Sequence, residues 1–231
     1  MKKYKHLLFD LDKTIWDFDN NSRETIFELY NDFGLQRKGI GDFNVFFLDY
    51  EKVNLELWGQ YRQNTISKEE LMYQRFNLVL LKYGIDDLAL AKEFSDKYLQ
   101  LLPSKTKVFP GTYETLQYLC DKYAMHIVTN GFEEVQFRKI QQAGLEKYFD
   151  QVITSEKAGY KKPDRNFFDF TLREIHAAAH ECLMIGDDIE VDLMGSMNAG
   201  IDQVFFNYEN INHEEIFTYE ISQLNELTGI L

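Results

Sequence analysis

The sequence predicts an α/β fold, in which helices cover both faces of a parallel, doubly wound sheet and a helical segment is inserted near the N-terminus. Two observations support this prediction. From residue 105 onward, short apolar runs alternate with helix-like stretches, which is the pattern of strand–helix–strand units. Between residues 15 and 104, helical signals dominate and strand signals are almost absent. We therefore expect a sheet domain made of residues 1–14 and 105–231, and a helical domain made of residues 15–104.

The predicted strands are short apolar runs that end in turn residues. They lie at residues 7–9, 125–128, 152–153, 182–185 and 203–206. The helices expected in the same half pass through residues 116–119, 135–140, 167–175 and 190–198. In the insertion, Ser22 precedes an apolar stripe that ends at Gly34, and Ser67 begins a capping box ahead of a helix that ends at Gly84. Two further helices are expected at residues 46–61 and 88–101.

Composition restricts the class of protein. Of 231 residues, 45% are hydrophobic and 15% are aromatic, which is typical of a folded globular chain. The net charge of -13 argues against binding to a nucleic acid polymer, which requires a basic face. No apolar run is long enough to span a bilayer, so we expect no membrane association. The two cysteines, Cys120 and Cys182, lie in apolar settings, and a reducing cytoplasmic location fits them best.

Two carboxylates follow the first predicted strand. Asp10 and Asp12 are two positions apart, so an extended chain would point both toward one pocket. Such a pair can divide the work of group transfer: one carboxylate acts as a nucleophile while the other passes a proton. The pair alone is equally compatible with a solvated turn.

Further polar residues follow other predicted strands. Thr129-Asn130-Gly131 follows one strand, Gly186-Asp187-Asp188 follows another, and Lys162 precedes a proline. Because ligands bind beyond the carboxyl ends of parallel strands, we expect these groups to meet in one site. Asp10 and Asp187 are oxygen ligands suited to Mg²⁺, and Lys162 would help to neutralise phosphoryl oxygens.

These groups together predict phosphoryl transfer. Asp10 would attack phosphorus and form an aspartyl-phosphate. Asp12 would protonate the leaving oxygen and then deprotonate the attacking water. Thr129 and the backbone N–H groups of Asn130 and Gly131 would hold the phosphoryl oxygens.

The four motifs DLDKT (residues 10–14), TNG (129–131), KP (162–163) and GDD (186–188) resemble those of the haloacid dehalogenase superfamily, in its order. The resemblance implies a Rossmann-like core and a helical C1 cap at residues 15–104. It also implies that the backbone carbonyl of Asp12 joins Asp10 and Asp187 around the metal, with Asp188 or Asp192 in support. Lys13 departs from the pattern, since many members have Gly or Asp there.

Within the insertion, residues 53–58 and 66–71 and the pair Arg75-Phe76 resemble the branch of 5'-nucleotidases that act on pyrimidine and non-canonical nucleoside monophosphates. Gln136, after the TNG motif, agrees with this branch. The resemblance implies a nucleoside monophosphate as the small-molecule partner, with Asn54 and Trp58 as substrate-binding residues. For the assembly we expect a monomer or a weak dimer.

Three alternatives remain open. A haloacid dehalogenase needs the nucleophile but no acid to protonate an alkoxide leaving group. By family resemblance, dehalogenases lack the second Asp, which is present here as Asp12. A phosphosugar phosphatase or phosphomutase shares every core motif. A non-catalytic regulator would retain a decayed site, which the full set of motif residues disfavours.

Overall fold

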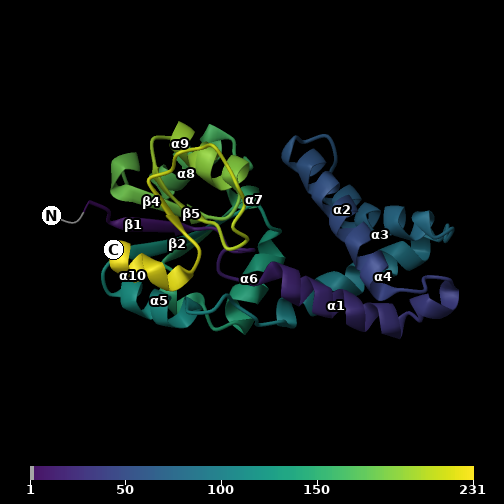
Figure 1. The fold of residues 1–231 in the computed structure, drawn as a ribbon. Helices are drawn as coiled ribbons and strands as arrows, with labels where there is room; N and C mark the ends of the chain where they lie inside the picture. Colours follow the sequence, from purple (N-terminus) through teal and green to yellow (C-terminus); the bar gives the residue numbers. More distant parts are fainter. Residues whose placement is uncertain (1–2) are drawn as a thin grey trace. The chain divides into compact units, whose positions relative to one another are not determined.

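The computed structural model describes residues 3–231, and these form two compact units. The first unit runs to Phe18 and resumes at Thr106, and the second comprises Asp19–Lys105 (Figure 1). The prediction placed the first boundary at residue 14. The first unit continues further because Trp16 is held to the preceding loop: its N–H donates to the Leu11 carbonyl oxygen at 2.8 Å, and its own carbonyl accepts from Lys13 at 2.9 Å. Identification of the second unit as a C1 cap stays a prediction.

The first unit contains the parallel sheet that the sequence predicts. Its six strands lie in the order β3-β2-β1-β4-β5-β6, and every neighbouring pair is parallel. Their bounds are β1 His6–Phe9, β2 Ala124–Thr129, β3 Gln151–Thr154, β4 Cys182–Gly186, β5 Asp202–Phe206 and β6 Tyr219–Ile221. Strand order reverses at β1, so the carboxyl ends of β2, β1 and β4 form the crevice where parallel sheets bind ligands. The edge strand β6 was not predicted, because it is short and partly exposed.

Helices cover both faces of this sheet. Figure 1 shows α8 and α9 on one face, with α5 and α10 on the other. The helices of the unit are α5 Thr112–Cys120, α6 Glu133–Gln142, α7 Ser155–Ala158, α8 Arg165–Glu174, α9 Gly195–Asn198 and α10 Leu227–Ile230. Phe167 and Phe168 of α8 pack with Leu8, Val128 and Met184 of the central strands, and all five side chains are buried. The three central strands beneath the site are therefore packed against α8.

One predicted helix differs in its geometry. Instead of a regular helix at residues 190–198, a π-helical segment, η5 (Ile189–Met194), precedes α9. The wider turn begins at Asp188, whose carbonyl oxygen accepts from the N–H of Leu193 at 3.3 Å and of Asp192 at 3.0 Å. Such wide turns often occur at functional sites, and this one carries Asp192.

The second unit is entirely helical. It comprises α1 Phe18–Asp32, which begins on the last residue of the first unit, α2 Phe43–Arg62, α3 Lys68–Lys82 and α4 Leu88–Leu101, with the short 3-10 helices η1 Leu35–Lys38 and η2 Leu102–Ser104. The capping box at Ser67 is confirmed. The Glu70 N–H donates to the Ser67 hydroxyl, and the Ser67 N–H donates to the Glu70 carboxylate. Ser22, expected at a helix start, lies inside α1, because the helix already begins at Phe18. Its buried hydroxyl lies 2.9 Å from that of Tyr98.

No helix within residues 3–231 combines the length and the hydrophobicity that crossing a membrane requires.

A pair of histidines lies in the amino-terminal halves of β1 and β2, away from the carboxyl ends that form the predicted site. Nδ1 of His6 in β1 lies 3.1 Å from Nε2 of His126 in β2, and the two rings are stacked. His126 is only 3% exposed. Burial, reinforced by the neighbouring His6, lowers the pKa of His126 from 6.5 to about 4.

The low pKa of His126 predicts acid sensitivity that His126→Leu should reduce. Below pH 6.5 the unfolded chain binds a proton at His126 that the folded protein does not accept until about pH 4, so stability falls as the pH drops through this interval. Urea titrations at about pH 7 and about pH 4.5 should show a loss roughly 2 kcal/mol larger for the wild type than for His126→Leu. The exposed His180→Gln serves as the control and should behave like the wild type. Equal losses in wild type and His126→Leu would contradict the assignment.

Candidate active site

The polar residues that follow the central strands meet at the carboxyl edge of the sheet. Asp10 follows β1, Thr129 ends β2, and Asp187 follows the last residue of β4. The N–H of Asp10 donates to the carbonyl oxygen of Ile185 in β4 at 2.9 Å, so the strand pairing continues up to the first carboxylate. The topology therefore brings together residues that are up to 177 positions apart in the chain (187 − 10).

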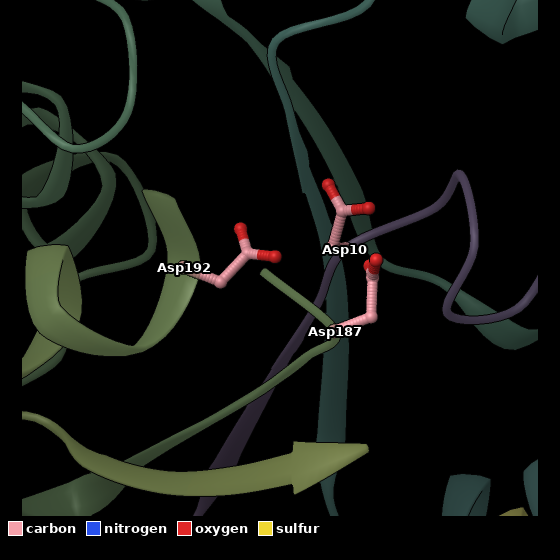
Figure 2. A group of neighbouring side chains, drawn as sticks. All are labelled: Asp10, Asp187 and Asp192. Carbon is pink, nitrogen blue, oxygen red and sulfur yellow. The ribbon is translucent and has the colours of Figure 1, made fainter. Parts of the chain in front are cut away.

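Three carboxylates form the centre of the site. One oxygen from each of Asp10, Asp187 and Asp192 lies within 4.8 Å of the other two. Figure 2 shows these side chains converging from the end of β1, the end of β4 and the η5 turn. Burial, with repulsion from the other carboxylates, raises the pKa of Asp10 to about 7 and that of Asp187 well above its ordinary value. Burial also raises the pKa of Asp192.

Lys162 lies between two of these carboxylates. Its Nζ donates to Asp10 at 2.7 Å, to Asp192 at 2.6 Å and to the Val128 carbonyl oxygen at 2.8 Å. The residue is only 1% exposed. Burial alone would lower its pKa, but the charges of Asp10 and Asp192 raise the pKa above its ordinary value. Lys162 is therefore a cation, and it is one positive charge against three carboxylates.

Asn130 holds the backbone of Lys162. Its side-chain amide accepts from the Lys162 N–H at 2.8 Å and donates to the Lys162 carbonyl oxygen at 2.9 Å. The sequence suggested Asn130 as a phosphate-binding residue. In the structure its side chain is engaged in positioning the lysine, so any contact with a phosphoryl oxygen would come from its backbone.

The sequence left open whether Asp188 or Asp192 lies beside Asp10 and Asp187, and the two side chains have different surroundings in the structure. The Asp188 carboxylate accepts from the N–H of Val191 at 2.9 Å and so caps the η5 turn. Asp192 instead lies in the cluster, and its side chain packs against Gly186. A Cβ on Gly186 would lie 2.5 Å from an Asp192 oxygen, a distance that real Cβ atoms do not show. Glycine at position 186 is therefore required for Asp192 to reach Lys162.

Thr129 has its acceptor positions filled. Its hydroxyl oxygen accepts from the Gly131 N–H at 3.0 Å and from the Gln136 side chain at 2.8 Å. A hydroxyl has two acceptor lone pairs and one proton, so the proton remains available for an acceptor supplied by a ligand. Gly131 was expected to contribute its N–H to phosphate, and that group is used within the loop. A Cβ on Gly131 would meet Gln136 at 2.2 Å, so the glycine makes room for this side chain.

Asp12 is held by helix α6. One carboxylate oxygen accepts from Lys139 Nζ at 2.6 Å and the other from Gln136 Nε2 at 2.9 Å. The Asp12 carboxylate is not part of the three-carboxylate cluster. Lys139 was not identified from the sequence. The available signal was its spacing from Gln136, because residues three apart in a helix share a face.

Asn54 and Trp58, which the sequence suggested as substrate-binding residues, lie in α2 of the second unit. Asn54 is buried, and its side-chain oxygen has no hydrogen-bond partner among residues 3–231. Trp58 is partly exposed and packs edge-on against Tyr61, with ring centroids 5.6 Å apart. Their part in substrate binding stays a prediction.

The cluster fits a divalent cation. Its donors are carboxylate oxygens, which Mg²⁺ prefers, and they are close enough for one ion to contact more than one of them. The raised pKa values of Asp10 and Asp187 indicate that Lys162 alone does not compensate the negative charge. Of the suggested ligands, Asp10 and Asp187 lie in this cluster.

Replacing Lys162 tests its electrostatic role. Lys162→Met should lower the free energy of unfolding of the metal-free protein by about 3–5 kcal/mol, because it leaves buried carboxylates without their cation. Adding Asp192→Asn should recover part of the loss, as measured by urea denaturation with a chelator present. The control is Lys157→Met, which removes an exposed ion pair to Glu174 and should cost less than about 1 kcal/mol. Additive losses in the double variant would rule out the coupling.

Comparisons with known proteins agree with this geometry. Residues 4–200 match the family model described as haloacid dehalogenase-like hydrolase. YfnB of Bacillus subtilis (strain 168), a protein named as a HAD-hydrolase, is 31% identical over 100% of this chain and 97% of its own. Its magnesium-bound crystal structure superposes with a TM-score of 0.90 at 29% identity, covering 99% of both chains.

Two further relatives carry more specific names. The pyrimidine 5'-nucleotidase PynA of Streptococcus pneumoniae (strain R6) is 32% identical over 99% of this chain and 95% of its own. The glyceraldehyde 3-phosphate phosphatase of Methanothermobacter thermautotrophicus is 27% identical over 89% of this chain and 86% of its own. The carboxylates that follow β1 and β4, the buried lysine between them and these full-length similarities lead to one conclusion. The chain belongs to the haloacid dehalogenase-like hydrolase family.

Proposed function

We propose that this protein is a Mg²⁺-dependent phosphomonoester hydrolase in which Asp10 is the nucleophile. The observation that carries the proposal is the position of Asp10. Its buried carboxylate lies at the reversal point of the sheet, 2.7 Å from the Lys162 ammonium and within the carboxylate cluster. A nucleophile in this place has a cation beside it for phosphoryl oxygens and oxygen ligands for a metal.

The metal would be held by the carboxylates of Asp10 and Asp187 and by the backbone carbonyl of Asp12, with Asp192 in support through Lys162. Bound Mg²⁺ would neutralise the phosphoryl oxygens and keep Asp10 ionised despite its raised pKa. Thr14 steadies this arrangement, because its hydroxyl donates to the Asp187 carboxylate at 2.9 Å.

The chemistry then proceeds in two steps. An oxygen of Asp10 forms a bond to phosphorus while the bond from phosphorus to the leaving oxygen breaks, and Asp12 gives that oxygen a proton. Water next attacks phosphorus and loses a proton to Asp12, the bond from phosphorus to Asp10 breaks, and inorganic phosphate is released. During both steps the charge of the Lys162 ammonium, whose three N–H groups are bonded to Asp10, Asp192 and Val128, would stabilise the phosphoryl group, and the hydroxyl proton of Thr129 would bind a phosphoryl oxygen.

For the substrate we propose a pyrimidine or non-canonical nucleoside 5'-monophosphate. Support comes from the full-length similarity to a protein named pyrimidine 5'-nucleotidase, together with the residues of the insertion described above. Sugar phosphates are the second candidate, because a relative named glyceraldehyde 3-phosphate phosphatase also aligns along most of the chain. Free Cys120 and Cys182 support a reducing, cytoplasmic setting.

A substrate screen tests this function. Purified protein with Mg²⁺ should release inorganic phosphate from nucleoside monophosphates, with kcat/KM highest for pyrimidine or modified bases, and a chelator should stop the reaction. Asp10→Asn should abolish turnover and keep the fold, because it removes the nucleophile but preserves the volume. It should also raise the unfolding midpoint of the metal-free protein by reducing repulsion within the cluster. Turnover of sugar phosphates alone would favour the second candidate, and turnover by Asp10→Asn would exclude this nucleophile.

The two roles of Asp12 can be separated with Asp12→Ala. A nucleoside 5'-oxygen is a poor leaving group that needs a proton, whereas nitrophenolate leaves without one. With p-nitrophenyl phosphate we expect a burst about equal to the enzyme concentration and then slow turnover, with phosphate trapped on Asp10. With the nucleotide we expect no burst and a loss of about 10²–10⁴-fold. The same fractional loss on both substrates, without trapped phosphate, would show that Asp12 has no acid–base role.

A further inference from the structure

We propose that Lys139 is a positioning residue for Asp12: with Gln136, it fixes the Asp12 carboxylate outside the metal cluster, where it can exchange a proton with the leaving oxygen. This inference rests on the proposed function, since it assumes that Asp12 is the acid and base. The two side chains both come from α6 and bind one oxygen of the carboxylate each, at 2.6 Å and 2.9 Å.

The first argument is the burial of Lys139. The residue is 2% exposed, and its side chain forms a salt bridge with Asp12, whose own side chain is 25% exposed. Removing an ammonium group from water is costly unless it gains strong partners. A surface lysine would meet the same carboxylate at lower cost, so the buried position provides a fixed direction that a solvated side chain would not.

The second argument is the wall against which Lys139 lies. Its Nζ is 4.3 Å from the ring centroid of Trp16, within the range of a cation–π interaction, and Trp16 is fully buried. Trp16 is bonded through its backbone to Leu11 and Lys13, on either side of Asp12. The loop that carries the acid therefore also supplies the surface that orients the lysine.

The third argument concerns the free lone pairs of Asp12. We call the two hydrogen bonds that Lys139 and Gln136 donate to its carboxylate the tether. Each carboxylate oxygen can accept two hydrogen bonds, and each Asp12 oxygen accepts one from α6. A lone pair on each oxygen remains for a proton to be transferred. Without the tether, Asp12 would be free to rotate toward the cation that its neighbour Asp10 helps to bind, and it would then face away from the leaving group.

Gln136 links this tether to the phosphate-binding threonine. The two N–H groups of its amide donate to Asp12 and to Thr129. A shift of α6 would therefore move the acid and the phosphoryl contact together. This is the arrangement expected if a single helix sets the distance between the transferred group and its proton donor.

The experiment compares leaving groups in single-turnover reactions of Lys139→Met. We expect release of the nucleoside to slow by about 10–100-fold, because a misplaced acid loses much of the roughly 10²–10⁴-fold contribution of general acid catalysis. Nitrophenolate release from p-nitrophenyl phosphate should change less than about 3-fold, because this group needs no proton. KM should stay near the wild-type value. Lys139→Arg should restore most of the nucleoside rate, because guanidinium can also bind the carboxylate.

Two variants make the test specific. Lys147→Met removes an exposed lysine from the segment after α6 and should behave like the wild type. In an Asp12→Asn background, Lys139→Met should cause no further loss on the nucleotide, since the group it positions is gone. Equal losses on the two leaving groups, or a full additional loss in the Asp12→Asn background, would overturn the proposal.

Failure of the tether and failure of the proposed function give different results. If the wild type releases no phosphate from any monoester, the proposed function fails. The tether is then judged from unfolding free energies of the single and double variants at Asp12 and Lys139: non-additive effects support it and additive effects overturn it. If Lys139→Met does not fold, Lys139→Gln takes its place, because it removes the ammonium but keeps the contacts of Gln136 with Asp12 and Thr129, and it should show the same dependence on the leaving group.

Discussion

The site depends on one buried interaction, the contact of the Lys162 ammonium with Asp10 and Asp192. These groups come from three separate segments. Burial by itself favours the neutral form of each, because it lowers the pKa of the lysine and raises the pKa values of the two acids. The two carboxylates keep Lys162 charged, but one ammonium only partly offsets the burial of both acids, so the pKa values of Asp10 and Asp192 stay raised. Asn130, which grips the Lys162 backbone from the end of β2, and Gly186, which leaves room for Asp192, keep the three at hydrogen-bonding distance. Residues beside the motif acids thus serve mainly to place one lysine.

The remaining negative charge has a functional consequence. Asp187 adds a third carboxylate, and burial together with the charges of Asp192 and Asp10 raises its pKa. A divalent cation would offset the repulsion among the three carboxylates, and a phosphoryl group would bring oxygens for the remaining coordination positions. The electrostatics that make the metal-free cluster unfavourable are therefore those that would favour the ion together with its substrate.

Asp12 and Asp10, which we propose as the acid and the nucleophile, differ in their surroundings. Asp10 lies in the buried cluster, whereas Asp12, two residues later, is partly exposed and is bonded to Lys139 and Gln136. Two carboxylates in one short loop thus have different partners. Asp10 is bonded to Lys162, and Asp12 is bonded to two side chains of α6. This division suits a pair in which one member must attack as an anion while the other exchanges protons.

The sequence by itself determined the parallel sheet, the helical insertion and the membership of Asp10, Asp187 and Lys162 in one site. It could do so because strand periodicity and strand-end polarity are local signals, and because parallel topology brings strand ends together. The capping box at Ser67 is local in the same way. Only the tertiary structure placed Asp192, and not Asp188, in the carboxylate cluster, brought Ser22 into a buried contact with Tyr98, and revealed the salt bridge of Lys139 with Asp12. Each of these outcomes depends on a partner far away in the chain, and the cost of burying a polar group is met only when that partner is in place.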